Sequence, residues 1–349
     1  MRRKSWALVS AASALLAAAV IFTGIRPAQA QSHWGANYFP NVTLTTQDGK
    51  PVKFYDDLLK GKIVVIDLIY TNCVDSCPLM TARLAQVQQM LGDRVGKDIF
   101  FYSISIDPER DTPQVLKAYA ESYHTGPGWL FLTGKKEDID LISKKIGLYQ
   151  EPDPNDRDGH MAKVLLGNEP AGQWLQNSAT DNARLLSVMI GDWLNSWTGK
   201  QKGTTGTSYA NVAPLNLEHG RYMFASQCAA CHTIGHGDKI GPDLLGVTSV
   251  RERQWLHQFI LRPDKMLAEG DPLAAALFKQ YKQVQMPNLR LVNADVDAII
   301  GFLEKEARAA AADQQQQHHH HGEQAPAATE EHHHHHEASP DGDKPGIKQ

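Results

Sequence analysis

Cysteine is scarce in this chain. Four cysteines occur among 349 residues, and all four lie in two short clusters. Cys73 and Cys77 are four residues apart, and Cys228 and Cys231 form a Cys-x-x-Cys pattern followed directly by His232. No cysteine remains for disulfides elsewhere in the fold. The first pair suits a metal or a disulfide and the second has the spacing of a haem-attachment motif, so redox chemistry is predicted in both halves.

An excess of positive charge is also lacking. The whole chain has 35 Lys and Arg against 39 Asp and Glu, for a net charge of −4. The first 30 residues contain four basic and no acidic side chains, so their removal leaves 31 basic against 39 acidic residues and a net charge near −8. Nucleic-acid phosphates are bound by basic surfaces, and this composition therefore argues against nucleic acid as a partner.

The N-terminal segment has the pattern of a secretory leader. A basic start at residues 2–4 precedes an Ala-, Leu- and Val-rich stretch over 7–25, and small residues at 28–30 offer a cleavage site. Residues 1–30 are therefore predicted to be a signal peptide. The alternative is an uncleaved anchor in the inner membrane, because about 19 apolar residues can span a bilayer. Both alternatives place the remaining chain in the periplasm.

Two further segments lack apolar periodicity. Residues 199–213 are small and polar and are predicted to be a linker. From residue 310 onward, Gln and His runs lie in an Ala-, Pro- and Glu-rich background with almost no large apolar side chains. Residues 310–349 are therefore predicted to be a disordered, His-rich tail. These boundaries define two domains, at 31–198 and 214–309.

The first domain has an α/β pattern. Residues 63–70 and 99–106 are β-branched and aromatic runs typical of buried strands, and leucines between them recur at helical spacing. This order predicts parallel strands joined by a right-handed crossover. The remaining predicted elements are a strand over 161–166 with a turn over 167–172, and helices over 112–123, 136–146 and 180–195.

The second domain is predicted to be small and all-α. Helices are expected over 217–227 and 295–309, the latter with Asn293 as its N-cap and acidic residues in its first turn. The intervening chain is rich in Gly and Pro, with shorter helical candidates over 249–261 and 272–284. A cofactor would help such a small domain complete its core.

The Cys73 and Cys77 pair is a candidate copper site. Cys73 follows a predicted strand and Cys77 lies where a helix begins. If both lie in the first helical turn, their Cβ atoms are about 5–6 Å apart, which permits a shared metal or a disulfide. The helix N-terminus favours thiolate, a soft ligand that suits Cu(I). Two thiolates leave copper short of ligands, and His160, which precedes a strand, is the best candidate for a third, although such a histidine taken alone is more often a surface or capping residue. A purely structural thiol pair is the alternative.

Two carboxylates near this pair have a structural explanation. Asp107 and Asp111 could form a catalytic pair, but the interpretation we favour is that they cap the helix starting near Thr112 and position the preceding loop. His124 is predicted to be a surface residue.

The first domain resembles the SCO/SenC family of thioredoxin-like copper chaperones, which act in cytochrome oxidase assembly. The matching pieces are residues 73–78, residues 105–113, and His160 before a strand that ends in a turn containing Gly172. The resemblance extends over nearly all of residues 40–195. It implies a thioredoxin-like fold and a partner that is a cytochrome oxidase subunit or another cuproenzyme.

The same resemblance implies that Cys73, Cys77 and His160 bind copper. Val74 departs from the family pattern, in which a proline often follows the first cysteine. The acidic segment 151–158 before His160 is a second departure. The ligand types survive both changes.

The second cluster predicts one covalent haem c. Cys228 and Cys231 would form thioethers with the haem vinyl groups, and the adjacent His232 would then be the proximal iron ligand. Residues 214–308 resemble class I cytochrome c through the segments 220–224, 241–244 and 286–289. The motif and its context together predict a haem domain.

The cytochrome c resemblance implies that Met286 is the sixth iron ligand and that the Pro242 carbonyl accepts the ring N–H of His232. His/Met ligation leaves no open iron site and favours electron transfer. The rival sixth ligands are Met223, Met266, His236 and His257.

Histidines at both ends suggest further metal binding. Nine of the sixteen histidines lie in the runs 318–321 and 332–336. The interpretation we favour is a metal-capturing tail, and the alternative is a cloning tag. Cleavage after Ala30 would place His33 third from a free amine, an arrangement that can hold Cu(II).

The leading functional hypothesis is an exported copper chaperone whose fused haem domain transfers electrons to or from the copper and dithiol site. Whether the protein is an enzyme stays open. One alternative is a haem-linked thiol-disulfide oxidoreductase that uses Cys73 and Cys77 as its redox pair. Another is an electron carrier whose first domain docks on an oxidase. Each alternative requires a redox partner protein.

Overall fold

The computed structural model describes residues 34–149, 162–194 and 218–321. The predicted leader, the linker 199–213 and the segment containing His160 lie outside these ranges. The described residues up to Glu304 belong to one compact unit, and residues from Lys305 onward belong to a second. None of the helices in the described ranges has the length and apolar character needed to cross a bilayer.

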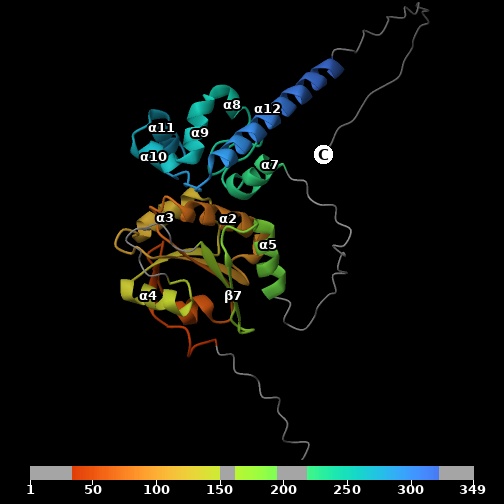
Figure 1. Ribbon diagram of the computed structural model, residues 1–349. Helices are drawn as coiled ribbons and strands as arrows, with labels where there is room; N and C mark the ends of the chain where they lie inside the picture. The colour runs from red at the N-terminus through yellow and green to blue at the C-terminus, as the bar shows by residue number, and fades with distance from the viewer. Residues whose placement is uncertain (1–33, 150–161, 195–217, 322–349) are drawn as a thin grey trace, which may run out of the picture. The chain divides into compact units, whose positions relative to one another are not determined.

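The first domain is built on one seven-stranded mixed sheet (Figure 1). Its order is β2-β1-β5-β4-β3-β6-β7. The central strands β3, β4 and β5 are parallel, whereas β6 runs antiparallel to β3 and β7 antiparallel to β6. The strands are β1 Thr43–Thr46, β2 Pro51–Lys53, β3 Ile63–Ile69, β4 Ile99–Ser105, β5 Trp129–Thr133, β6 Lys163–Asn168 and β7 Gln173–Ser178.

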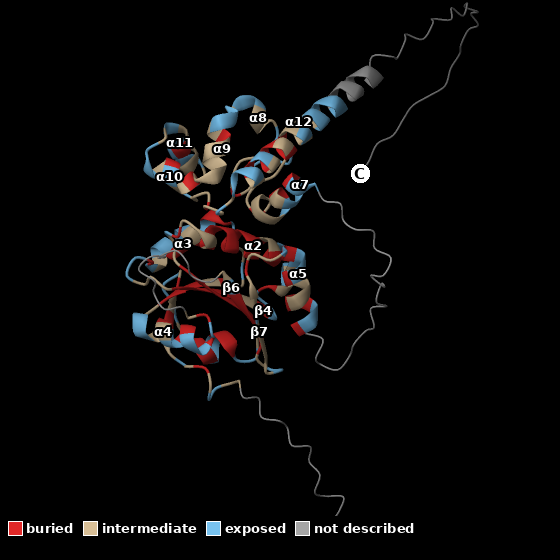
Figure 2. Cartoon of the chain, in the orientation of Figure 1, coloured by how far each residue is buried: buried red, intermediate tan, exposed pale blue. Residues whose placement is uncertain are grey.

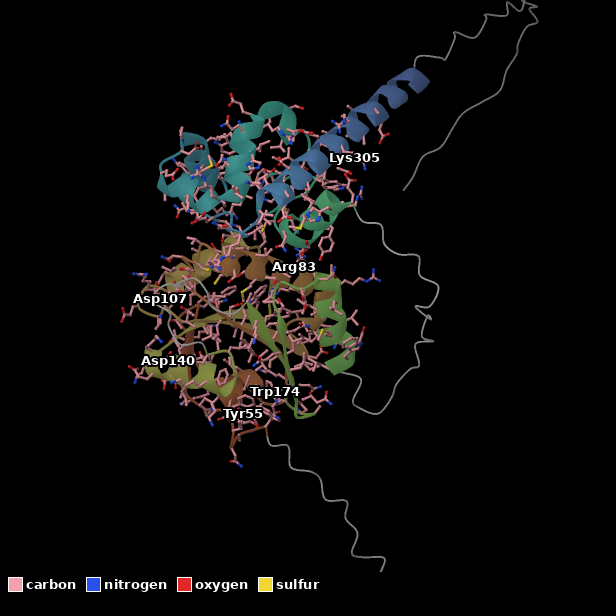
Figure 3. All side chains as sticks on the ribbon, viewed as in Figure 1. Tyr55, Arg83, Asp107, Asp140, Trp174 and Lys305 are labelled. Atoms are coloured by element: carbon pink, nitrogen blue, oxygen red, sulfur yellow. The ribbon has the colours of Figure 1, made fainter. Side chains whose placement is uncertain are left out.

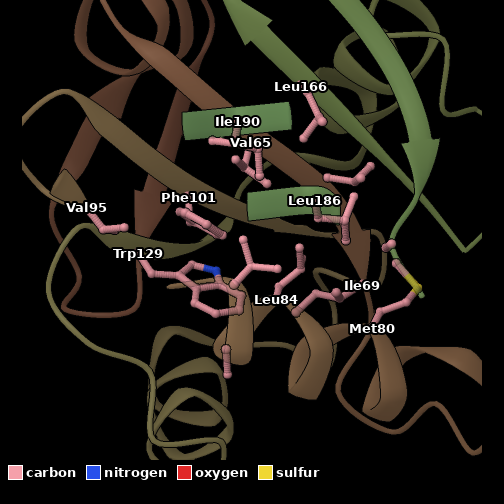
Figure 4. Close-up of a cluster of buried hydrophobic side chains, with 14 of the residues drawn as sticks. Val65, Ile69, Met80, Leu84, Val95, Phe101, Trp129, Leu166, Leu186 and Ile190 are labelled. Atoms are coloured by element: carbon pink, nitrogen blue, oxygen red, sulfur yellow. The ribbon is translucent and has the colours of Figure 1, made fainter. Parts of the chain in front are cut away.

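Helices cover both faces of this sheet. The helical elements are η1 Phe54–Leu59, α2 Ser76–Leu91, η2 Gly92–Arg94, α3 Pro113–Ser122, α4 Lys136–Lys145, α5 Ala183–Val188 and η3 Met189–Trp193. On one face, Leu84 of α2 and Leu186 of α5 pack in a cluster with Val65 and Phe101 of the sheet (Figure 4). On the other, Ile139 of α4 belongs to a separate cluster with η1. The alternation of side chains along each strand produces the two cores.

The strand–helix–strand prediction is confirmed by β3, α2 and β4. All seven residues of β3 are buried, and six of them are apolar. Figure 2 shows that buried residues are concentrated in the strands of the sheet. The predictions did not include β1, β2, β5 and β7. Strands β1 and β2 are short and β7 is a half-buried edge strand, whereas β5 is an apolar, largely buried interior strand that was missed. The predicted helix over 180–195 is interrupted, since α5 gives way to the π-helical turn η3.

The second domain contains α7 to α12. The crossing of α7 and α12 requires Gly220, because a Cβ there would lie 2.0 Å from the carbonyl oxygen of Ala298. Phe224 and Phe302 pack beside this crossing with ring centroids 5.7 Å apart. The elements are α7 His219–Met223, η5 Phe224–Cys228, α8 Val247–Val250, α9 Arg253–Leu261, α10 Pro263–Ala268, α11 Pro272–Gln280 and α12 Asn293–His321.

Helix α12 differs from its prediction at both ends. Asn293 is the first helical residue and not a cap outside the helix, and the Asp295 carboxylate accepts a hydrogen bond from the Val292 amide at 3.2 Å. The helix also continues to His321, so the predicted disorder does not describe residues 310–321. Ala and Gln are good helix formers and extend a helix already nucleated in the core.

Candidate dithiol and haem sites

Cys73 and Cys77 lie in the connection between β3 and α2. Helix α2 begins at Ser76, so Cys77 is in its first turn whereas Cys73 precedes it. The condition that both cysteines lie in the first helical turn is therefore not met. The Cys73 amide instead donates to the Tyr70 carbonyl at 3.2 Å, which folds the loop back toward the strand end. Both side chains are buried, at 3% and 0% exposure.

A buried carboxylate anchors this loop. Asp111 accepts hydrogen bonds from the Thr71 amide at 3.1 Å, the Thr71 hydroxyl at 2.5 Å and the Ser105 hydroxyl at 2.5 Å. These contacts join the chain just before Cys73 to the end of β4. Charge-assisted hydrogen bonds of this kind are about twice as strong as neutral ones. The position of Cys73 is therefore fixed by a residue 38 positions away in the sequence.

The predicted capping role of Asp107 and Asp111 is wrong, although the loop-positioning role of Asp111 is present. The N-cap of α3 is Thr112, whose side chain accepts from the Val115 amide. Asp107, labelled in Figure 3, instead pairs with Arg110 at 3.4 Å. The predicted surface position of His124 is confirmed, since it is exposed with a φ of 55°.

The two thiols have unequal acidity. A hydrogen bond from Cys77 lowers the pKa of Cys73 to about 7, and backbone amides of Cys77 and Asp75 lower it further, against the opposing effect of burial. Burial raises the pKa of Cys77, as does its position as the donor to Cys73. Near neutral pH the pair therefore holds one proton between two sulfurs. A metal would displace that proton, because metals bind thiolates.

Asp67 is a buried acid that the sequence did not assign to the site. It lies in β3 at 1% exposure, and burial raises its pKa to about 7. Ser103 donates to its Oδ1 at 2.7 Å, but its Oδ2 has no hydrogen-bond partner within the described residues. The Asp67 charge also contributes to the raised pKa of Cys77. The feature of the sequence that could have identified Asp67 is an acidic residue within an otherwise apolar strand.

The donor set at this loop fits a soft metal such as Cu(I), since it offers two buried sulfurs, one with a lowered pKa. His160, the predicted third ligand, lies outside the described residues. Within the ranges the structure describes, no cluster of three His, Cys, Asp or Glu side chains forms a metal site.

The second site is an apolar cavity of ≈ 270 Å³. Cys228, Cys231, His232 and Met286 all line it, so the fold brings the four predicted haem-binding residues to one place. Its other walls include Trp255, Phe259, Leu277 and Ile299. Two thiols, an imidazole and a thioether around apolar walls fit the covalent and axial bonding of haem c.

The imidazole of His232 is held in one orientation. Its Nδ1 lies 2.9 Å from the Pro242 carbonyl oxygen, which can only accept, so Nδ1 donates and the predicted hydrogen bond is present. A neutral ring with its proton on Nδ1 leaves Nε2 as the ligating atom. Burial lowers the pKa of His232, which keeps the ring neutral. Gly241 is required beside it, because a Cβ would lie 2.6 Å from the His232 Cε1.

The rival sixth ligands do not line this cavity. Met223, Met266, His236 and His257 are all described residues, yet Met286 is the methionine among those lining the cavity. Met266 is buried at 8% exposure in α10, which is the ordinary position of a core methionine.

Two family models match the chain. Residues 30–182 match SCO1/SenC, and residues 217–306 match cytochrome c. These segments correspond to the sheet domain with the dithiol loop and to the helical domain with the apolar cavity.

Individual relatives match the first domain. The SCO1 protein homolog of Bacillus subtilis is 36% identical over 128 residues, which is 36% of this chain and 65% of the relative. The chain therefore spans slightly under two thirds of that relative's length. The copper-bound ScoI structure of Bradyrhizobium japonicum is 28% identical over 43% of this chain and 94% of that chain, with a TM-score of 0.37. BsSco, a Sco-family cytochrome c oxidase assembly protein with a disulfide switch, is 30% identical over 43% of this chain and 89% of that chain, with a TM-score of 0.37.

Proposed function

We propose that this chain, whose first domain matches the SCO1/SenC family model and whose second matches the cytochrome c model, is a copper chaperone for the assembly of cytochrome oxidase or another cuproenzyme. Its fused haem domain exchanges electrons with the copper and dithiol site. The observation that carries the proposal is the buried pair Cys73 and Cys77 in one chain with an apolar cavity that gathers four haem-binding residues.

Copper is the cargo of the first domain. Cys73 and Cys77 supply two thiolates, and His160 supplies the third ligand. The lowered pKa of Cys73 makes one thiolate available near neutral pH, and copper releases the shared proton on binding. Asp111 holds the loop in place while the metal enters and leaves.

Haem c, when bound, supplies one-electron exchange at an iron with no open coordination position. Cys228 and Cys231 would attach it covalently, and His232 and Met286 would bind its iron. The Pro242 carbonyl fixes the ring of His232, and the apolar walls exclude water. With copper at the thiols, the haem would accept or return one electron at a time, and this exchange would set the oxidation state in which copper is delivered.

The protein acts in the periplasm in this proposal, because the leader at 1–30 exports the chain and the leader either is removed or anchors it to the inner membrane. The recipient is an oxidase subunit or another cuproenzyme, and a separate redox protein exchanges electrons with the haem. The His-rich tail buffers metal ions.

Anaerobic metal analysis of the full chain tests the proposal. We expect one Cu(I) and one covalent haem per chain. Cys73→Ser abolishes stoichiometric copper but keeps the haem, whereas the matched variant Cys228→Ser keeps the copper and loses one thioether. A wild-type protein that binds no copper under reducing conditions contradicts the chaperone function.

A haem-linked thiol-disulfide oxidoreductase is the second candidate. It is favoured by the hydrogen bond between the two thiols and the lowered pKa of Cys73, the properties of an attacking thiol. Forming the Cys73–Cys77 disulfide from one thiolate and one thiol releases two electrons and one proton, so a haem acceptor would take up the electrons in two successive one-electron steps. His160→Ala separates the candidates: loss of copper with retained disulfide exchange assigns His160 to metal binding, and unchanged copper removes it from the ligand set.

A further inference from the structure

The haem-attachment segment and helix α2 are in contact within the unit that ends at Glu304. Arg83, labelled in Figure 3, donates from Nη2 to the Ser226 carbonyl at 2.6 Å. Gln86 donates to the Ala229 carbonyl at 3.0 Å. The apolar part of the contact joins Leu79, Ala82 and Tyr123 to Ala230 and Ile240, with Leu289 packed against them.

A second contact joins the two site loops themselves. The Asn288 amide donates to the Val74 carbonyl at 3.1 Å, and Val74 lies between the two cysteines. Arg290 donates to the Asp75 carboxylate at 2.8 Å, although Asp75 is also between the cysteines and 215 residues away. The loop between Cys73 and Cys77 is thus joined by hydrogen bonds to the segment that follows Met286.

The Asp75 side chain takes part in this contact and does not cap helix α2. Asp75 occupies the N-cap position of α2, where an aspartate usually accepts from a helix amide, yet its side chain makes no capping hydrogen bond. Its carboxylate pairs with Arg290 instead and is 19% exposed. Rearrangement of the loop between the cysteines therefore moves an acceptor of the Met286 segment.

Asn288 connects that acceptor to Met286. Its side chain accepts from the Arg290 amide at 3.0 Å and donates to Asp264 at 2.9 Å. Pro287 separates it from Met286, and a proline fixes its own φ and restricts the preceding residue. The backbone of Arg290 has a φ of 52°, a conformation that residues other than Gly and Asn rarely adopt. This indicates that the segment is constrained by its contacts. Asn288 is therefore joined to Met286 through a single residue of restricted backbone.

We propose that the segment Met286–Arg290 senses whether copper occupies the Cys73–Cys77 loop and conveys that state to the haem. Copper draws the two sulfurs onto one metal and reshapes Val74 and Asp75. The contacts of these residues with Asn288 and Arg290 then alter the position of Met286, and with it the potential of the haem. This coupling rests on the proposed function, because it requires copper at the thiols and Met286 on the iron.

Coupling between the two sites is reciprocal. If copper changes the haem equilibrium, then oxidation of the haem changes the affinity for Cu(I) by the same factor. We expect a factor of about five, at the low end of typical coupling, which equals about 40 mV for a one-electron couple. Oxidation of the haem thereby becomes a signal that retains or releases the cargo.

The test uses the full holoprotein under anaerobic conditions. The haem potential and the near-infrared band of methionine-ligated ferric haem are measured before and after one equivalent of Cu(I). We expect both to change in the wild type. Arg290→Gln should bind copper fully but lose most of the change, and the charge-swapped pair Asp75→Arg with Arg290→Asp should recover part of it.

Gln86→Ala is the matched control, because it removes a contact between α2 and the haem-attachment segment without touching the loop between the cysteines. It should keep the wild-type response. Stoichiometric copper with no haem response overturns the coupling and leaves the chaperone function intact, whereas absence of copper uptake overturns both. An undiminished response in Arg290→Gln also overturns the coupling, because simple electrostatic repulsion between the centres would survive that change.

Discussion

The dithiol loop and the haem cavity place their cysteines in contrasting surroundings. Cys73 and Cys77 are held by buried polar groups, since Asp111 ties down the preceding residues and Asp67 lies in the adjacent strand. Cys228 and Cys231 line an apolar cavity, and burial raises the pKa of both, to about 12 and about 11. This contrast fits the two kinds of chemistry. An exchangeable metal needs a thiolate that forms near neutral pH, whereas a cysteine sulfur in a thioether carries no charge.

Of the substitutions that test this contrast, Asp67→Asn should have the largest effect. The pKa of Asp67 is raised from 3.8 to about 7 by burial, so the native protein binds the proton more tightly than the unfolded chain. Wild-type stability therefore decreases as pH rises from about 4 to 7, by on the order of 4 kcal/mol for a shift of this size. Asp67→Asn should abolish that decrease and be the more stable protein above pH 7.

Urea unfolding of the first domain at pH 4.5 and pH 8 measures this difference. Asp107→Asn is the control, because Asp107 lies on the surface and pairs only with Arg110 in a partly exposed ion pair. Equal pH dependence in Asp67→Asn and the wild type would show that Asp67 is ionised without penalty.

Gly241→Ala should disturb the haem region alone. The added Cβ would lie 2.6 Å from the His232 ring, so the ring must move and its hydrogen bond to Pro242 must lengthen. Overpacking of this kind costs about 1–3 kcal/mol. We expect weaker spectral bands of the axially ligated haem and unchanged Cu(I) binding. Gly301→Ala is the control for glycine replacement, because a Cβ there would meet no atom within 4 Å and its φ is not positive. An unaltered axial spectrum would mean that the ring has room to move.

Asp111→Asn should disturb the dithiol region alone. The amide cannot accept from all three Thr71 and Ser105 donors as the carboxylate does. A buried donor left without a partner costs about 1–3 kcal/mol. Cu(I) affinity and protection of the Cys73 amide from hydrogen exchange should both fall, while the haem spectrum stays unchanged. Retained protection at Cys73 would assign the loop geometry to other contacts.

The helix N-caps should give the smallest effects, with the larger of the two at Asp271, which also accepts a hydrogen bond from Trp255 Nε1 at 3.2 Å. Thr112 caps α3 in the first domain and Asp271 caps α11 in the second through the Ala274 amide at 2.8 Å. Replacement of either by Ala should cost about 1 kcal/mol, measured as a shift in the unfolding midpoint. A much larger loss for one variant would show that its cap also supports the neighbouring site.

Much of the fold was predictable because its signals are local. The apolar runs of β3 and β4 and the helical spacing of α2 specify a buried strand–helix–strand unit. Strand β7 was missed because half-buried polar residues carry no such pattern. Within the haem region, Met286 was distinguished from Met266 by its motif, and the cavity lining agrees with that choice.

The sequence by itself determined the chemistry available to this protein: two thiols four residues apart, a haem-attachment motif, and the strands and helices that bear them. These depend on residues close together in the chain. Tertiary structure alone decided which thiol is the more acidic, that Asp67 holds a proton near neutral pH, and that Asp75 meets Arg290. Burial and contacts between distant segments set these properties, and neither is expressed in local spacing.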